Sequence, residues 1–223
     1  MFLFCLTCAC FTHSAVLTAA EPIHLFADKN LRQWQFHTDQ AGIKAEDVFA
    51  FTEEGTLTCK GQPFGWLGTK KMYRNFRLAA EYRWVGEPTN SGIFVRITRQ
   101  PQNTFLPRCC EIQLKYQNNG DLVGLHGMKL PAPAGTAADR IINRNGGKKI
   151  GQLTGVKKLT DAESEKGSWN SLEIFCHNGL IVVVENGKMV NWVLDAEPSA
   201  GFIGFQSEGG GVEFRNAVLS VIR

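Results

Sequence analysis

The sequence predicts an all-β protein, a two-sheet antiparallel β-sandwich of the jelly-roll type. Short segments in which apolar and polar residues alternate recur along the chain, whereas apolar residues at helical spacing are scarce. Turn signals separate these segments, most clearly Asn178-Gly179 and Asn186-Gly187, because Asn-Gly favours a two-residue type I′ hairpin. Two packed antiparallel sheets are a common arrangement for such a chain.

The first twenty residues differ from the rest of the chain. No charged residue occurs from Phe2 to Ala20, and small residues precede Glu21, as signal peptidase requires. Thr, Ser and His interrupt the apolar run, so we expect no membrane span. The segment predicts a signal peptide at 1–20 and a single exported β-sandwich domain at 21–223, located in the periplasm or outside the cell.

Charge and cysteine content exclude several classes of function. The 223 residues carry a net charge of only +3, with scattered basic residues, so we expect no nucleic-acid partner. No CxxC motif or Cys/His cluster indicates zinc. Cys110 and Cys176 end or line apolar runs, which suits buried free thiols, although export would permit a disulfide. Lipid attachment at Cys8 or Cys10 is the alternative to cleavage, but neither lies in a good lipobox.

The clearest predicted strand is 76–84. Side chains two apart in a strand share a face, which places Phe76, Leu78, Ala80, Tyr82 and Trp84 together on an apolar face. Towards the C-terminus, alternation and turn signals predict further strands at 171–176, 180–185, 189–194, 201–206 and 212–221.

Two predicted strands between 90 and 116 present polar side chains. Glu111, Gln113 and Lys115 share one face of the second strand, and Cys110, Ile112 and Leu114 share its apolar face. In the first strand, Phe94 and Arg96 share a face. Together the polar faces would form a platform for a ligand, and the alternative is an ordinary solvated outer face.

Residues 129–166 break the pattern. They contain Pro131, Pro133, several glycines and many charges, with little apolar periodicity. A loop this long in a compact domain is usually functional or disordered, and it follows the Glu111 strand. We therefore expect a rim or lid over the site.

Several common catalytic motifs are missing from the sequence, which excludes the corresponding reaction classes. The chain has no P-loop, no dinucleotide fingerprint, no HExxH and no GxSxG elbow. The run from Glu111 to Lys115 contains one carboxylate, which is inadequate for two-carboxylate glycoside hydrolysis. His126 is a catalytic candidate because it follows the polar strand, and Trp66 could stack on a sugar, although isolated histidines and core tryptophans usually have structural roles.

Several segments, in order along the chain, resemble one known family. They include 61–65, 69–76, 81–84, Asn90-Ser91-Gly92-Ile93-Phe94, 107–114, 167–170, Gln206-Ser207-Glu208-Gly209 and 213–216. Each motif is weak alone, but their order and spacing are similar to those of the 3-keto-disaccharide hydrolase family, across roughly 23–223. The resemblance implies an exported bacterial protein with a concanavalin-like jelly roll and a small carbohydrate, a 3-keto-glycoside, as its substrate.

The resemblance also implies a mechanism. A ketone at C3 acidifies the C2 hydrogen, so a base can remove it and the C1 oxygen can leave; hydration then completes a hydrolysis, and without hydration the enzyme is a lyase. Glu111 is the expected base or divalent-metal ligand, with Gln113 and Arg96 on the ketone oxygen and Asn90 at the sugar. Further candidates are Asp121 and His126 for catalysis, and Trp66, Gln206 and Glu208 for substrate binding.

A second class of function stays open. Jelly rolls host many activities, so a non-catalytic carbohydrate-binding module is the alternative. A pure binding site would depend more on exposed aromatic side chains than on a lone carboxylate.

Overall fold

The computed structural model describes residues 21–222. The predicted signal peptide at 1–20 therefore lies outside the described residues. Within the described part, no helix is long and apolar enough to cross a membrane.

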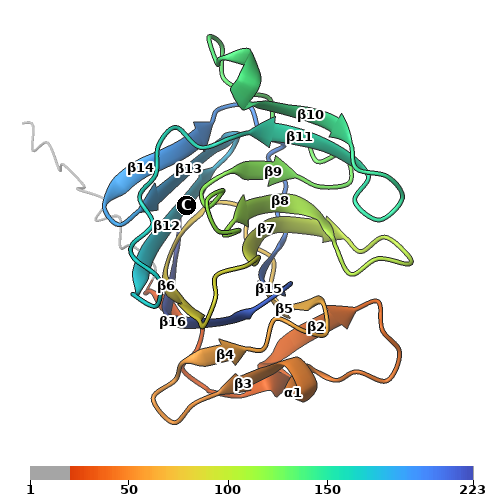
Figure 1. Ribbon diagram of the computed structural model, residues 1–223, viewed down its shortest axis with the longest axis vertical. Coiled ribbons are helices and arrows are strands. Elements are labelled where there is room, and N and C mark those ends of the chain that lie inside the picture. Colours follow the sequence, from red (N-terminus) through yellow and green to blue (C-terminus); the bar gives the residue numbers. More distant parts are fainter. Residues whose placement is uncertain (1–20, 223) are drawn as a thin grey trace, which may run out of the picture.

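Two antiparallel sheets pack face to face, as predicted, and form the two layers in Figure 1. The first sheet has the strand order β14-β13-β12-β6-β16-β4-β3, with β1 pairing β16. Its strands are β1 (Ile23–His24), β3 (Phe49–Phe51), β4 (Leu57–Cys59), β6 (Phe76–Val85), β12 (Asn170–His177), β13 (Leu180–Glu185), β14 (Lys188–Val193) and β16 (Gly211–Val221).

The second sheet carries the polar strands. Its order is β10-β11-β9-β8-β7-β15-β5-β2. The strands are β2 (Trp34–Thr38), β5 (Gly65–Thr69), β7 (Gly92–Arg99), β8 (Arg108–Gln113), β9 (Leu122–Gly124), β10 (Ile141–Asn145), β11 (Gln152–Val156) and β15 (Phe202–Ser207). Helical structure is limited to α1 (Ala45–Val48) and the 3-10 turns η1 (Leu31–Gln33) and η2 (Ala138–Arg140) within residues 21–222.

The space between the sheets holds the main core. The predicted apolar face of β6 is confirmed, since Phe76, Leu78, Ala80, Tyr82 and Trp84 are all at most 5% exposed. Cys110, Ile112 and Leu114 also point into this core, which confirms the assignment of the apolar face of β8. A smaller cluster covers the other face of the second sheet: Trp66, Phe94, Ile97, Phe105, Leu106, Cys109, Leu125 and Leu153.

The expectation of one long loop at 129–166 is wrong. The segment contains η2 and the hairpin β10–β11, which extends the second sheet beyond β9 (Figure 1). The strands are short, and β10 is exposed along most of its length, so apolar alternation is weak. Pairing with β9 stabilises the hairpin, and that pairing depends on contacts remote in sequence.

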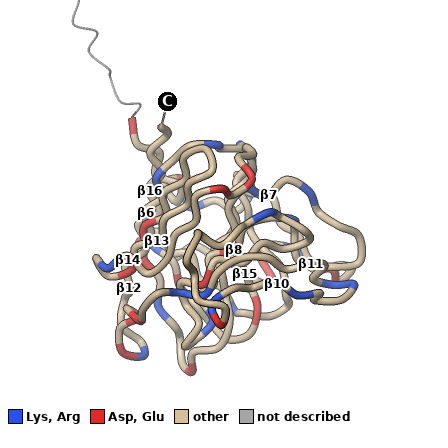
Figure 2. The backbone as a smooth tube through the Cα atoms, turned by 90° about the horizontal axis from the view of Figure 1, so that it is seen from above, with Lys and Arg blue, Asp and Glu red and all other residues tan. Residues whose placement is uncertain are grey.

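Basic and acidic residues are interspersed (Figure 2), and the described cysteines are buried. Figure 2 shows Lys and Arg interspersed with Asp and Glu over the surface. All four described cysteines, Cys59, Cys109, Cys110 and Cys176, are buried and free, so the prediction of buried thiols for Cys110 and Cys176 is confirmed.

Candidate functional site

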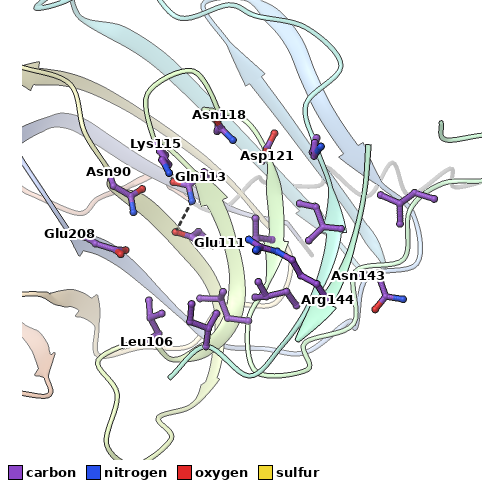
Figure 3. A pocket seen from close by; sticks show the side chains of 17 residues that line it. Asn90, Leu106, Glu111, Gln113, Lys115, Asn118, Asp121, Asn143, Arg144 and Glu208 are labelled. Atoms are coloured by element: carbon purple, nitrogen blue, oxygen red, sulfur yellow. Dashed lines mark hydrogen bonds between the residues drawn. The ribbon is translucent and has the colours of Figure 1, made fainter. Parts of the chain in front are cut away.

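A pocket of about 620 Å³ opens on the outer face of the second sheet. It brings together residues from β8, β9, the β10–β11 hairpin and the loops before β7 and after β15 (Figure 3). The lining residues are Asn90, Leu106, Glu111, Gln113, Lys115, Asn118, Asp121, Val123, Leu125, Ile141, Ile142, Asn143, Arg144, Ile150, Leu153, Lys157 and Glu208.

Strand register explains why Glu111 lies at the floor. Phe94 pairs with Glu111, Glu111 with Val123, Val123 with Gly155, and Gly155 with Ile142. Directly paired residues point to the same side of a sheet, so this row crosses the floor of the pocket.

Glu111 is a buried carboxyl group with few partners. It is 5% exposed, and its side chain accepts one long hydrogen bond, 3.5 Å from Gln113 Nε2 to Oε1. Burial raises the pKa of Glu111 to about 8, and the nearby charges of Glu208 and Asp121 add to this effect. A carboxyl group in this environment binds its proton tightly and becomes a strong base once ionised.

The other two carboxyl groups of the pocket are held by hydrogen bonds. Glu208 Oε2 accepts a 2.6 Å bond from Gln206 Nε2, and Asp121 Oδ1 accepts a 2.7 Å bond from the Lys158 backbone amide. Burial raises the pKa of both carboxyl groups. Glu111 is therefore the lining carboxylate most available for chemistry.

Gly92 makes room for this arrangement. A Cβ at Gly92 would lie 2.9 Å from both Gln206 Oε1 and Glu111 Oε1. Gln206 is fully buried beneath the pocket, so it supports Glu208 and does not line the cavity. The buried acceptors Gln206 Oε1 and Asn90 Oδ1 have no hydrogen-bond partner within the described structure.

The expectation that Arg96 faces the pocket is wrong. The register shifts between Val95 and Arg99, and Arg96 itself has a positive φ of 57°. This bulge removes Arg96 from the face shared with Phe94, and its side chain is fully buried. The guanidinium donates to the backbone oxygens of Asn178 and Glu197, so Arg96 connects loops of the sandwich.

Trp66 and His126 also lie away from the pocket lining. Trp66 is 1% exposed, stacks on His37 at 4.4 Å and donates to Gln100, so it cannot stack on a sugar in this conformation. The chain turns at His126, whose φ is 51°, and its ring lies against Gly151. The predicted stacking role of Trp66 is therefore inconsistent with the geometry, and His126 lies outside the lining of the pocket that contains the other candidates.

The structure assembles the remaining candidates. Glu111, Asp121, Asn90, Gln113 and Glu208 all line one pocket, as Figure 3 shows. Sequence reasoning missed the far wall, formed by the hairpin residues Ile142, Asn143, Arg144, Ile150, Leu153 and Lys157. The glycine pair in Asn145-Gly146-Gly147, between two short segments containing β-branched residues, was a usable hairpin signal.

A metal site does not form from these side chains alone. Within residues 21–222, no group of three or more His, Cys, Asp or Glu side chains is arranged to hold a metal ion. Of the two roles expected for Glu111, the arrangement of its neighbours suits that of a base better than that of a metal ligand.

The fold and site define a class. The chain has a two-sheet jelly roll with a carboxylate-containing pocket on one sheet face, and solved structures with a similar fold include a carbohydrate-binding module. The sequence model of the 3-keto-alpha-glucoside-1,2-lyase-like domain matches residues 21–220, and the chain belongs to this family. The resemblance seen in the sequence is thus confirmed. A search of curated proteins found no match.

Solved structures agree on the fold. Two candidate glycosyl hydrolases from Parabacteroides distasonis are 22% and 19% identical, with TM-scores of 0.62 and 0.61. Each match covers 91% of this chain, and 100% and 94% of the respective protein. The carbohydrate-binding module CBM66 from Bacillus subtilis is 8% identical with a TM-score of 0.54, over 83% of this chain and 94% of the module.

Proposed function

We propose that this protein cleaves the glycosidic bond of 3-keto-glycosides by removing the C2 proton and eliminating the C1 oxygen. The observation that supports this most is Glu111, a single weakly engaged carboxyl group at the floor of the pocket. Membership of the 3-keto-alpha-glucoside-1,2-lyase-like family is consistent with this chemistry.

Each residue has a specific part in the proposed reaction. Ionised Glu111 accepts the proton from C2, and the C3 oxygen takes up the negative charge. Gln113 and Lys115, beside Glu111 in the pocket, donate hydrogen bonds to that oxygen. The C1–O bond then breaks, C1=C2 forms and the ketone is restored. Addition of water to the resulting enone would make the net reaction a hydrolysis.

The alternative is a non-catalytic carbohydrate-binding module, which the similarity in fold to CBM66 would suit. Such sites rely on aromatic faces for sugar stacking. The pocket lining contains no Trp, Tyr or Phe among the described residues, and it contains a carboxyl group whose pKa is raised to about 8. This composition favours proton transfer over passive binding.

The test is Glu111→Gln, which keeps size and removes the base. Turnover of a 3-keto-glucoside, followed by loss of its alkaline absorbance, should fall by about 10²–10⁴-fold. The wild-type rate should rise with pH, reach half its maximum near pH 8 and level off above it, because only ionised Glu111 accepts the proton. His126→Ala, outside the pocket lining, is the control and should retain activity. Full activity in folded Glu111→Gln would exclude Glu111 from the mechanism.

A further inference from the structure

The pocket is divided into a polar half and an apolar half, and Glu111 lies at the boundary. On one side are Asn90, Gln113, Lys115, Asn118, Asp121, Lys157 and Glu208. On the other are Leu106, Val123, Leu125, Ile142, Ile150 and Leu153, with Ile141, Asn143 and Arg144 of β10 along their edge. Figure 3 shows Gln113 and Asp121 on one side of Glu111 and Leu106 on the opposite side, with Glu208 lateral to Glu111.

Strand register produces the division. Two residues beyond Glu111 along β8, Gln113 lies beside Asp121, since the Gln113 amide donates to the Asp121 carbonyl. Two residues before Glu111, Cys109 lies beside Leu125, whose amide donates to the Cys109 carbonyl. The rows on either side of Glu111 therefore have opposite character across neighbouring strands, which fixes the boundary in the fold.

Starting from the proposed function, we infer that the substrates are 3-keto-glycosides with an aromatic aglycone. The ring of the keto sugar, rich in hydroxyl groups, lies over the polar half, where Asn90 Oδ1 is a buried acceptor with no partner in the described structure. The aglycone lies over the apolar half. A second sugar there would place most of its hydroxyl groups against aliphatic side chains, which cannot hydrogen-bond, and only Asn143 and Arg144 of β10 could bind them.

The positive charge of Arg144, at the edge of the apolar half, favours an aromatic ring over an alkyl chain as the aglycone. Arg144 extends from β10 into the pocket towards Glu111 (Figure 3), and it pairs in register with Leu153 of the apolar half. A guanidinium group binds aromatic faces and stabilises a nearby anion. An aromatic aglycone would contact both the aliphatic side chains of the apolar half and the guanidinium group of Arg144.

The chemistry of the leaving group also favours an aromatic aglycone. Every carboxyl group lining the pocket lies at the boundary or in the polar half, and the described lining includes no histidine. The apolar half thus offers no acid of ordinary strength to protonate a departing oxygen. A phenol, with a pKa of about 10, leaves as phenolate, whereas water, the reference for a hydroxyl leaving group, has a pKa of about 15.7. In the elimination, Glu111 gains the C2 proton, the C1–O bonding pair leaves on the phenolate, and C1=C2 forms.

The experiment compares kcat/KM for phenyl and methyl 3-keto-glucosides in wild type and in Ile142→Asn. Ile142 lies on the edge strand β10 and contributes an aliphatic side chain to the apolar half. Losing this apolar contact should lower the phenyl-to-methyl ratio by about tenfold, equivalent to the burial of one or two methylene groups. Because wild type and variant are compared on the same two substrates, the intrinsic reactivity of phenolate cancels.

Control variants separate recognition from folding. Ile23→Asn makes the same change at an exposed position on β1 of the other sheet and should leave the ratio unchanged. Ile150→Asn, a second apolar position, should reproduce the effect of Ile142→Asn if that variant does not fold. Arg144→Gln should also reduce the ratio.

The outcomes distinguish the inference from the proposed function. If methyl 3-keto-glucoside is consumed and neither Ile142→Asn nor Ile150→Asn changes the ratio, the aromatic subsite is wrong and the proposed function stands. If the wild-type protein consumes no 3-keto-glucoside of either kind, the proposed function fails and the inference fails with it.

Discussion

At the scale of single residues, three carboxyl groups of one pocket differ because their neighbours differ. Backbone and amide donors hold Asp121 and Glu208, whereas Glu111 is buried with one long contact. Burial without compensation costs stability and provides reactivity, a common property of catalytic groups. This difference leads to a prediction about stability that is independent of turnover.

Glu111→Gln should stabilise the fold at neutral pH. The pKa of Glu111 rises from 4.5 to about 8 on folding, so the folded state binds the proton more tightly. The stability that protonated Glu111 contributes to the folded state is fully present below pH 4.5 and is lost as the pH rises through about 8. At about pH 7 the variant should exceed wild type by on the order of 3 kcal/mol, and at about pH 4 the gain should vanish. Urea unfolding at both pH values measures the difference in free energy of unfolding between the variant and wild type.

A matched control for this measurement is Glu173→Gln. Glu173 forms an exposed ion pair with Arg77, and such pairs contribute about 0–1 kcal/mol. A gain at neutral pH in Glu173→Gln as large as in Glu111→Gln would mean that burial of Glu111 is not the cause.

Arg96→Met should destabilise the protein without directly affecting the pocket. The substitution removes the two hydrogen bonds that the buried Arg96 guanidinium donates to the backbone oxygens of Asn178 and Glu197. The expected loss is about 3–6 kcal/mol, at about 1.5–3 for each hydrogen bond that involves a charged group. Thermal unfolding measures the loss. Activity of the fraction still folded at low temperature should stay within a few-fold of wild type; abolished turnover in a stable variant would return Arg96 to the site.

At the scale of elements, the β10–β11 hairpin converts an open sheet face into a pocket. Its attachment to β9 depends on Gly155, which pairs with Val123 and has a φ of 141°. A Cβ there would lie 2.0 Å from the Leu122 carbonyl oxygen. The hairpin can therefore pair closely with β9 only because residue 155 is glycine.

Gly155→Ala should detach or displace this wall. Backbone strain of this kind costs about 1–3 kcal/mol, and the steric contact adds to it. Turnover of a 3-keto-glucoside should fall together with thermal stability. Gly147→Ala is the matched control, because Gly147 lies in the same hairpin with a φ of 78°, and a Cβ added there would meet no atom within 4 Å. Equal activity of the two variants would show that the hairpin does not shape the site.

At the scale of the whole molecule, the sandwich supports the site from behind. Alternate residues of β8 face the main core, among them Cys110 and Ile112, while Glu111 between them faces the pocket. The core thus fixes the strand that carries the proposed base.

We also propose that the protein is exported and that its mature form begins at Glu21. Residues 2–20 carry no charge and end in small residues, and the family match begins at residue 21. N-terminal sequencing of protein recovered from the periplasm or medium of a bacterial host should give Glu21 first. Ala20→Arg should block this cleavage. An intact Met1 in periplasmic protein would contradict the proposal.

The sequence alone determined the fold class and which side chains of β8 share the face of the candidate pocket. Alternation along 76–84 fixed the core face of β6, and alternation along 110–114 separated Glu111 and Gln113 from the apolar side. Both conclusions follow from local geometry, since a regular strand places every second residue on the same side.

Only the tertiary structure decided where Arg96 points, where His126 lies and how the pocket is closed. The bulge at Arg96 depends on pairing with two neighbouring strands, whose registers both shift there. The β10–β11 hairpin is stabilised by β9, because Leu122–Gly124 of β9 pairs with Thr154–Val156 of β11. These two segments are far apart in the sequence. Local alternation cannot encode such features, because their stability comes from contacts between segments that only folding brings together.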